Sequence, residues 1–325
     1  MTSQRDVSIA IDLGGTRIRV AVIDRTGTVL KREEEPTLAN QGRDQTVGRL
    51  TQIITKLMPS TQGREVIGIG ASLAGPVDPD TATMYSPPNL PGWDGFSLKP
   101  LLEEAFGIPM WAVNDATLGA IGEHAYGIGQ GVANLVYVTV STGIGGGIIV
   151  GGKPLLGARG FAAEIGHMSI DRNGPLCKCG NAGCIEALAS GTAIADLALE
   201  RLKRGEKSIL QDMVNGDLAQ VDAKAVMEAS VRGDSLAVKL VSQFARDLGL
   251  GLVSLMHIFD PQMIILGGGV GQSYRIYSTA LNAAIRSNVM DHLRGHINIV
   301  TSMLGDNASL LGAAHLAFQR GGQNQ

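Results

Sequence analysis

The stretch "VSIAIDLGGTRIRVAVIDRTGTVLKREEE", residues 7–35, alternates like successive strands of an antiparallel sheet. Tight turns are expected at "DLGGT" (12–16) and "DRTG" (24–27). After a predicted helix at about 115–126, the pattern starts again with "NLVYVTVSTGIGGGIIVGGKPL" (134–155). Two such units, each extended by helices and parallel strands, predict a duplicated α/β fold with a cleft between the copies.

The intervening segments supply the helices and parallel strands that this fold needs. Apolar residues recur at helical spacing over residues 45–58, and "EVIGIGASLAG" and "IPMWAVND" are typical of buried strands. Two helices are expected between the second unit and the strand "MIILGGGV". A helix from about residue 274, the strand "INIVTS" and a last helix after Asn307 complete the pattern.

The expected division of the chain follows from this repeat. The junction between the copies is predicted near residues 114–130, and the final helix is expected to fold back onto the first domain. The smaller N-terminal α/β domain would then comprise residues 1–114 with 306–325. The larger α/β domain would comprise residues 115–305.

Composition excludes several classes of protein. The 325 residues are enough for two domains with apolar cores, and 44% hydrophobic with 18% charged residues is typical of a globular enzyme. A net charge of −3 argues against nucleic acid or an anionic membrane as the main partner. No apolar run reaches the ~18 residues of a membrane span. The polar start "MTSQRDVS" is unlike a signal peptide, so a cytoplasmic location is expected.

All three cysteines lie in "HMSIDRNGPLCKCGNAGCIE", residues 167–186. Three thiols leave one over whichever pair forms, and an oxidised framework does not fit an expected intracellular protein. Cys177, Cys179 and Cys184 with His167 form a Cys₃His set, which suits tetrahedral zinc. Four protein ligands would close the coordination sphere, so the metal would be structural. A reduced cysteine-rich turn without metal is the alternative.

Three glycine turns follow apolar strands: "DLGGT" (12–16), "STGIGGG" (141–147) and "LGGGV" (266–270). Such turns expose successive backbone N–H groups, which suit phosphate oxygens. Each turn taken alone is also an ordinary hairpin or strand exit. Together they predict a nucleotide site built from two facing turns, one in each domain.

The motifs "IAIDLGGTRI", "VNDA", "STGIGGGI", "AEIGH" and "CKCGNAGCIE" resemble, in this order and spacing, the ROK family of sugar kinases and related repressors. The resemblance runs from about residue 7 to 318. It implies the actin-like ATPase (ribonuclease H-like) fold, a duplicated two-domain α/β architecture with an interdomain cleft. It also implies transfer of the γ-phosphoryl group of Mg–ATP to a sugar hydroxyl.

The resemblance assigns the glycine turns to the nucleotide. The implied ligands of the ATP phosphates and Mg²⁺ are Asp12, Gly14, Gly15 and Thr16 on one side and Thr142, Gly143, Gly145 and Gly146 on the other, with Gly268 and Gly269 against the adenosine. The residues that match the family's zinc ligands are His167, Cys177, Cys179 and Cys184.

The sugar side of the implied site draws on several segments. The implied sugar-binding residues are Gly75, Asn89, Asn114, Asp115, Glu164, His167 and Glu186. Asp115 matches the catalytic base and Asn114 a ligand of a sugar hydroxyl, although Asn–Asp before a helix is also an ordinary N-cap. Glu164 and Glu186 have the alternative of solvated surface acids. His167 is implied to bind zinc with one ring nitrogen and a hydroxyl with the other. Trp93 fits the core better than a stacking platform.

The acceptor and the assembly are less constrained by these motifs. Glucose is preferred because "NLPGW" followed by "FSLKPLLEE" resembles the family's glucokinases. N-acetylmannosamine and N-acetylglucosamine kinases share the other motifs, and a non-catalytic sugar sensor is a further alternative. A repressor of the family would carry an N-terminal helix-turn-helix, whereas this chain starts its nucleotide domain within ten residues of Met1. The expected assembly is a homodimer or homotetramer.

Overall fold

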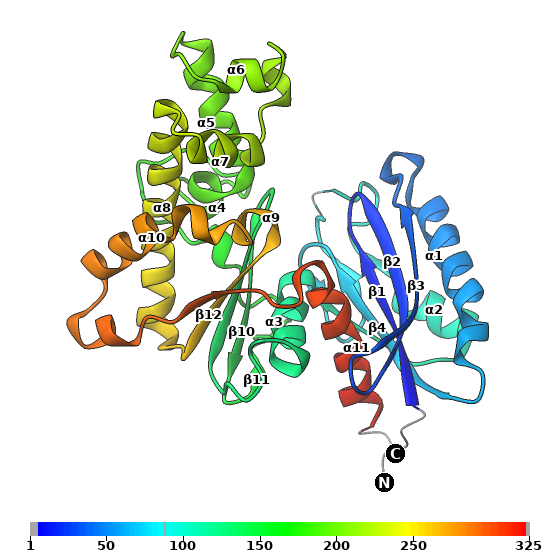
Figure 1. Ribbon diagram of the computed structural model, residues 1–325. Coiled ribbons are helices and arrows are strands. Elements are labelled where there is room, and N and C mark those ends of the chain that lie inside the picture. Colours follow the sequence, from blue (N-terminus) through cyan, green and yellow to red (C-terminus); the bar gives the residue numbers. More distant parts are fainter. Residues whose placement is uncertain (1–5, 88, 323–325) are drawn as a thin grey trace. The chain divides into compact units, whose positions relative to one another are not determined.

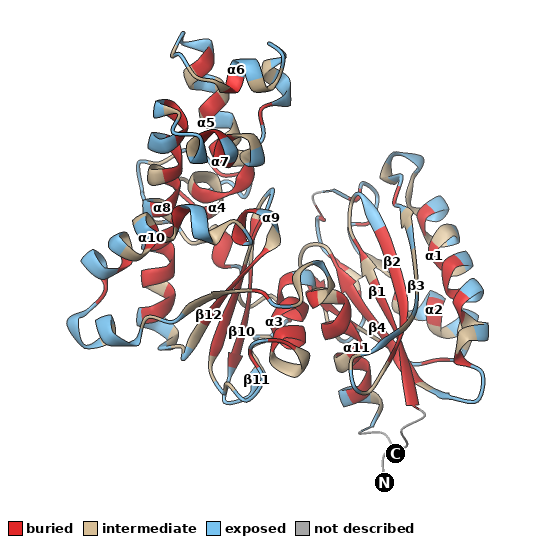
Figure 2. Ribbon diagram, in the orientation of Figure 1, coloured by how far each residue is buried: buried red, intermediate tan, exposed pale blue. Residues whose placement is uncertain are grey.

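The computed structural model describes residues 6–87 and 89–322 of the chain. Its strands form two five-stranded sheets and one three-stranded sheet, and helices cover the larger sheets (Figure 1). Buried residues concentrate in the central strands and on the helix faces that cover them (Figure 2). No helix in the described part of the chain has the length and apolar character to span a membrane.

The first sheet has the strand order β3-β2-β1-β4-β8. Its strands are β1 (Asp6–Leu13), β2 (Arg17–Asp24), β3 (Val29–Pro36), β4 (Glu65–Leu73) and β8 (Met110–Asn114). The first three strands pair antiparallel, and β4 and β8 continue the sheet in parallel from β1. The antiparallel opening and the two later strands expected from the sequence are therefore confirmed.

Two pairs of helices pack on this sheet. They are α1 (Arg43–Leu57), α2 (Lys99–Phe106), α3 (Asp115–Tyr126) and α11 (Ala308–Gly321). The apolar stripe of α1 is buried with Ile9 and Ile11 of β1 in one cluster, which also contains Trp93. Trp93 is 1% exposed, so its assignment to the core is confirmed. Helix α11 packs on α3 so closely that a Cβ on Gly312 would overlap the backbone carbonyl of Leu118.

A small antiparallel sheet and three 3₁₀ turns lie in the same part of the chain. The sheet has the order β5-β6-β7, with β5 (Val77–Asp78), β6 (Thr83–Met84) and β7 (Phe96–Ser97). The turns are η1 (Ala39–Gln41), η2 (Met58–Thr61) and, before α11, η6 (Gly305–Asn307). The sequence analysis did not predict this small sheet.

The second large sheet has the order β11-β10-β9-β12-β13, which repeats the order of the first. Its strands are β9 (Leu135–Val140), β10 (Ile144–Val150), β11 (Lys153–Pro154), β12 (Met263–Gly267) and β13 (Ile299–Thr301). β10 and β11 pair antiparallel, and β12 pairs in parallel with β9 and β13. The predicted duplication is therefore present in the strand topology.

Helices make up most of the chain between β11 and β13. They are α4 (Ile185–Ala189), α5 (Gly191–Lys203), α6 (Leu210–Met213), α7 (Ala223–Val231), α8 (Ser235–Phe259), α9 (Gly268–Gly271) and α10 (Tyr274–Asn288), with η3 (Ile165–His167), η4 (Leu218–Gln220) and η5 (Asp291–His296). Phe244 of α8 packs edge-on against Tyr277 of α10, with ring centroids 5.1 Å apart. Two helices were expected before β12, whereas the structure has five there, α4 to α8. That expectation was wrong.

Internal contacts divide the chain into two compact units. Unit 1 contains Met1–Val132, Gly147–Ala163 and Asp306–Gln325, and unit 2 contains Ala133–Gly146 and Glu164–Gly305. The C-terminal segment joins unit 1, as in the predicted division. Residues 115–132 and 147–163 also join unit 1, whereas they were predicted in the larger domain. Helix α3 packs against α11, and Gly147 lies against α3. The predicted domain bounds stay a prediction.

Candidate active site

Strand β1 ends in the first predicted nucleotide turn. Asp12 lies near the end of the strand, and the Gly14 N–H donates to the carbonyl of Arg17 at 3.0 Å, which closes the turn. Thr37 stabilises this turn from β3's side, since its hydroxyl donates to the Gly14 carbonyl at 2.7 Å. A Cβ on Gly15 would overlap Asn89. The structure thus brings Asn89, a predicted sugar ligand, against the turn predicted for phosphate.

The Asp12 carboxylate has a partner that the sequence analysis missed. Arg19 lies opposite Asp12 in the β1–β2 register and donates from Nε and Nη2 to Oδ2, the Nε distance being 2.9 Å. Two residues that face each other across a hairpin are recognisable once the turn is placed, because register fixes the pairs. Arg19 could therefore have been found from its spacing around the "DLGGT" turn.

Asn114 and Asp115 stand where β8 gives way to α3. The Asn114 Oδ1 accepts from the N–H groups of Ala116 and Thr117 at 3.0 and 3.3 Å, so the predicted N-cap is present. Its Nδ2 donates to the Gly75 carbonyl at 3.2 Å. Asp115 is the first residue of α3, and its Oδ1 accepts from Ala116 N–H at 2.8 Å. This cap holds Asn114 and the exposed Asp115 side by side next to Gly75.

The second predicted nucleotide turn lies between β9 and β10 in unit 2. Ser141 N–H donates to the Gly143 carbonyl at 2.9 Å, and Gly191 N–H at the start of α5 donates to the Ser141 carbonyl at 2.7 Å. The Glu186 side chain closes the turn, because its Oε2 accepts from the Ile144 N–H at 2.9 Å. A predicted sugar ligand therefore also orders the turn predicted for phosphate.

The remaining glycines of the predicted nucleotide turns occupy regular structure, whereas Thr142 lies in the bend before β10. Gly145 and Gly146 are the second and third residues of β10, and Thr142 accepts from Thr192 N–H at 3.3 Å. Gly268 and Gly269 start the short helix α9 directly after β12. The strand before the third glycine turn was expected, whereas the short helix directly after it was not.

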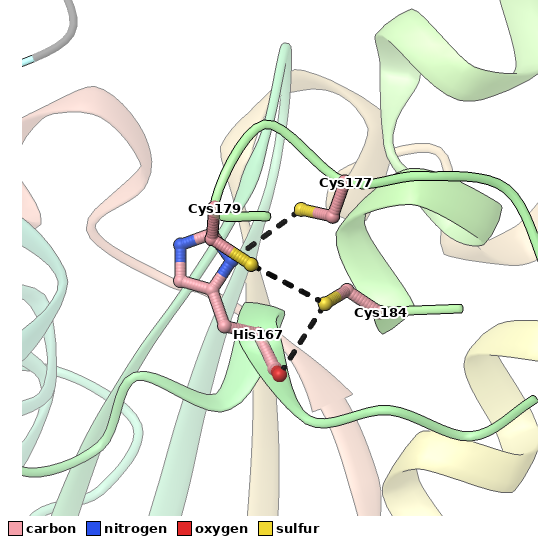
Figure 3. Close-up of side chains that lie close together, drawn as sticks. All are labelled: His167, Cys177, Cys179 and Cys184. Carbon is pink, nitrogen blue, oxygen red and sulfur yellow. Dashed lines mark hydrogen bonds between the residues drawn. The ribbon is translucent and has the colours of Figure 1, made fainter. Parts of the chain in front are cut away.

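The four predicted zinc ligands converge in unit 2 (Figure 3). Their ligand atoms all lie within 4.8 Å of one another, and the three cysteines are free thiols. The Cys177 Sγ lies 3.6 Å from the His167 Nδ1, and the Sγ atoms of Cys179 and Cys184 are 3.6 Å apart. Zinc–sulfur bonds of about 2.3 Å and zinc–nitrogen bonds of about 2.0 Å in a tetrahedron imply ligand separations of roughly 3.5–3.8 Å. The two separations of 3.6 Å match this range, and three thiols with one imidazole are a donor set that tetrahedral zinc takes.

Backbone geometry brings these ligands together. Gly180 and Gly183 have φ values of 95° and 66°, as the sequence analysis expected for tight turns between the sulfurs. The Asn181 backbone N–H lowers the pKa of the Cys179 thiol, whereas burial raises the pKa of Cys184 to about 12. Because zinc binds thiolates, metal binding at this site would release protons.

Two predicted sugar ligands flank this cluster. Glu164 precedes the short helix η3 that carries His167, and the Glu164 carbonyl accepts from the His167 N–H at 3.1 Å. Desolvation raises the pKa of the Glu164 carboxyl, while His167 opposes that rise and Glu186 adds to it. Glu164 therefore lies within electrostatic range of both His167 and Glu186. With His167 Nδ1 facing the sulfurs, Nε2 is the ring nitrogen left for another partner.

The predicted site residues fall into two sets. Unit 1 holds the turn at 12–16 together with Gly75, Asn89, Asn114 and Asp115. Unit 2 holds the turn at 141–146, the zinc cluster and the two glutamates. Within each unit, the structure joins a predicted phosphate turn to a predicted sugar ligand.

Comparison with known proteins decides the family. The ROK family pattern matches residues 8–320. The chain belongs to the ROK family. A glucokinase of Thermotoga maritima is 32% identical over 312 residues, which are 96% of this chain and 97% of that protein. The solved structures include a ROK family glucokinase from Streptomyces griseus in complex with glucose and AMPPNP, with 34% identity, a TM-score of 0.82 and coverage of 96% of this chain and 99% of that one.

Other ROK family relatives act on a different sugar. The N-acetylmannosamine kinase of Escherichia fergusonii is 33% identical over 310 residues, which are 95% of this chain and 98% of that protein. The predicted family is thus confirmed, and so is the actin-like ATPase fold with its duplicated α/β architecture. The roles of individual site residues stay predictions.

Proposed function

We propose that this ROK family chain is an ATP-dependent sugar kinase that phosphorylates the 6-hydroxyl of a hexose, with glucose as the preferred acceptor. The solved glucokinase of the family with glucose and AMPPNP supports both substrates. The observation in this chain that carries the proposal is the exposed Asp115 carboxylate, held at the start of α3 by a capped turn. A fixed carboxylate beside Asn114 suits a base that must meet one particular hydroxyl.

Asp115 would act as the general base. Its carboxylate takes the proton of the sugar hydroxyl while the hydroxyl oxygen bonds to the γ-phosphorus, and the bond from that phosphorus to the ADP oxygen breaks. Asn114 is oriented by its cap and by Gly75, so it would hold a neighbouring hydroxyl in place. Glu164, Glu186 and His167 would bind the remaining hydroxyls as acceptors and donor.

The glycine turns and Asp12 would hold the nucleotide. Backbone N–H groups in the turns at 12–16 and 141–146 would bind the phosphates, and Gly268 and Gly269 would lie against the adenosine. Asp12 would bind the Mg²⁺ that accompanies ATP, and this ion would neutralise charge on the phosphates. Zinc in the Cys₃His cluster would be structural, since four protein ligands leave no open position.

A second acceptor class is supported by the relatives. An N-acetylmannosamine kinase is as similar to this chain as the glucokinases are and matches it over nearly its whole length. An N-acetylhexosamine is therefore the alternative acceptor. A non-catalytic sugar sensor is less consistent with an exposed Asp115 and both nucleotide turns. The expected homodimer or homotetramer is part of the same proposal.

A coupled spectrophotometric assay with Mg–ATP and a panel of hexoses and N-acetylhexosamines tests the proposal. Glucose should give the highest kcat/KM, and Asp115→Asn should lower kcat by at least about 10²-fold, as removal of a general base does. Asp44→Asn serves as the control because the Asp44 side chain is 87% exposed on α1, away from the predicted residues. Near-normal turnover in folded Asp115→Asn protein would disprove the assigned base, and no phosphorylation of any sugar would disprove kinase activity.

A further inference from the structure

A polar row crosses three strands of the first sheet beneath α11. Arg19 of β2, Asp12 of β1 and Ser72 of β4 are paired in register, so their side chains share one face. The side chains of Arg19 and Asp12 are only 9% and 14% exposed. The Ser72 hydroxyl is fully buried and has no hydrogen-bond partner among residues 6–87 and 89–322. This face therefore contains a largely buried ion pair next to a buried hydroxyl.

The Arg19 guanidinium donates hydrogen bonds to two different partners. Nε and Nη2 donate to the Oδ2 of Asp12, and Nη1 donates to the backbone carbonyl of Asp306 at 2.6 Å. Among the residues that the structure describes, the other carboxylate oxygen, Oδ1, accepts only from the Ser309 hydroxyl, at 3.4 Å. Arg19 thus fixes one oxygen of Asp12 and leaves the other with a single long contact.

A buried ion pair of this kind is weak evidence for stability, because desolvating both charges offsets most of their attraction. The planar fork of arginine does fix geometry, since its donors hold a partner in one orientation. The purpose of Arg19 is therefore better sought in the orientation of Asp12 than in folding.

We propose that Arg19 is a positioning residue for nucleotide binding. By holding Oδ2, it presents Oδ1 of Asp12 as the acceptor for the Mg²⁺ of Mg–ATP, and it ties that carboxylate to Asp306. The inference rests on the proposed kinase function, because it takes Asp12 as the ligand of the nucleotide's metal.

Arg32 supplies a matched control. It donates from Nη1 to the Asn307 Oδ1 at 2.9 Å, so it holds the same segment before α11 without contacting Asp12. If both Arg19→Met and Arg32→Met weaken nucleotide binding, the cause would be the segment before α11. If only Arg19→Met weakens nucleotide binding, the cause would be the lost orientation of the Asp12 carboxylate.

The test measures the Kd of Mg–AMPPNP by titration calorimetry on the full chain, together with the Kd of the sugar and the thermal midpoint. Arg19→Met should weaken Mg–AMPPNP roughly 10- to 100-fold, the usual loss when a partner of a metal ligand is removed. The Kd of the sugar and the Kd of Mg–AMPPNP for Arg32→Met should stay within about twofold of the wild type. In a double-mutant cycle, Asp12→Asn should abolish most of the effect of Arg19→Met, because both act through one carboxylate.

Several results overturn the inference. Wild-type Mg–AMPPNP affinity in folded Arg19→Met protein would do so, and so would an equal loss with Arg32→Met. If Arg19→Met does not fold, Arg19→Lys replaces it: lysine keeps the charge but not the fork, so affinity should fall at least about threefold, and unchanged affinity refutes positioning. A wild-type chain that binds Mg–AMPPNP but phosphorylates no sugar would refute the proposed function alone. A wild-type chain that does not bind the nucleotide would refute both.

Discussion

Replacing Gly143 with alanine should weaken sugar binding, although Gly143 belongs to a turn predicted for nucleotide. A Cβ at this position would overlap the Oε2 of Glu186, the same oxygen that accepts from the Ile144 N–H at 2.9 Å. Gly143 does not have a positive φ, so alanine fits its backbone. The substitution should therefore act by displacing the Glu186 carboxylate rather than by straining the turn.

The size of the effect follows from the bond that is lost. A hydrogen bond to a charged group contributes about 1.5–3 kcal/mol. If the displaced carboxylate loses its sugar contact as well, a change of this size weakens sugar binding about 10- to 150-fold. Affinity for ATP should also fall, because the displaced Glu186 carboxylate no longer accepts from the Ile144 N–H and the turn loses that support.

The assay is titration calorimetry with glucose, or with the best acceptor of the panel, in the absence of nucleotide. Gly269→Ala is the matched control, since Gly269 also belongs to a predicted nucleotide turn but has no neighbouring atom within 4 Å of the place that a Cβ would take. Its sugar affinity should stay within about twofold of the wild type. A folded Gly143→Ala protein with unchanged sugar affinity would refute the link between Glu186, the turn and the sugar.

Two further predictions concern metal and stability. Elemental analysis should find about one zinc per chain. Cys179→Ser should reduce sugar affinity or stability far more than ATP affinity. Metal-free protein with normal sugar kinetics would contradict a structural zinc. Burial alone would raise the pKa of Asp234, but hydrogen bonds from Ala237, Ile209 and Ser208 outweigh burial and lower it. Asp234→Ala should therefore lower the free energy of unfolding in urea by about 0.5–2 kcal/mol at neutral pH. This difference should shrink as the pH falls through the lowered pKa of Asp234. A difference that does not depend on pH would contradict the ionised cap.

The parts of the fold with strong periodicity could be predicted from the sequence. The helical stripe at 45–58 became α1, and the strands expected at "EVIGIGASLAG" and "IPMWAVND" became β4 and β8. The start of α10 at Tyr274 and of α11 at Ala308 also agrees with the predicted positions. The helices among them bury one face, α1 and α11 against the first sheet and α10 against α8, so their apolar spacing is visible in the sequence.

The elements that were not predicted from the sequence lack such a signal. The region of α4 to α8 contains short helices, and α6 has only 4 residues, too few for a periodic stripe. The strands β5 to β7 have 2 residues each and are defined by pairing with one another rather than by their own pattern. Short elements depend on tertiary contacts, and one sequence does not display those contacts.

The candidate site divides in the same way. Motif residues such as Cys177 and His167 were identifiable because their side-chain chemistry and spacing are unusual together. Arg19 becomes recognisable only once the register of the hairpin is placed. The Glu186 contact was not identifiable, because glutamate is ordinary at the surface and only the fold shows that this side chain is directed at a turn.

The short helix α4 offers a physical reason to place every thiol in one loop. Its N-cap is Cys184, a predicted zinc ligand, and Glu186 lies in its first turn. The backbone ties the helix to the segment after His167, since the Ile185 N–H donates to the Met168 carbonyl at 3.0 Å. A helix of 5 residues has little stability of its own, so what holds Cys184 also holds Glu186. Zinc bound at the cluster would therefore steady both the sugar ligand and, through the Ile144 N–H, the glycine turn that is predicted to bind phosphate.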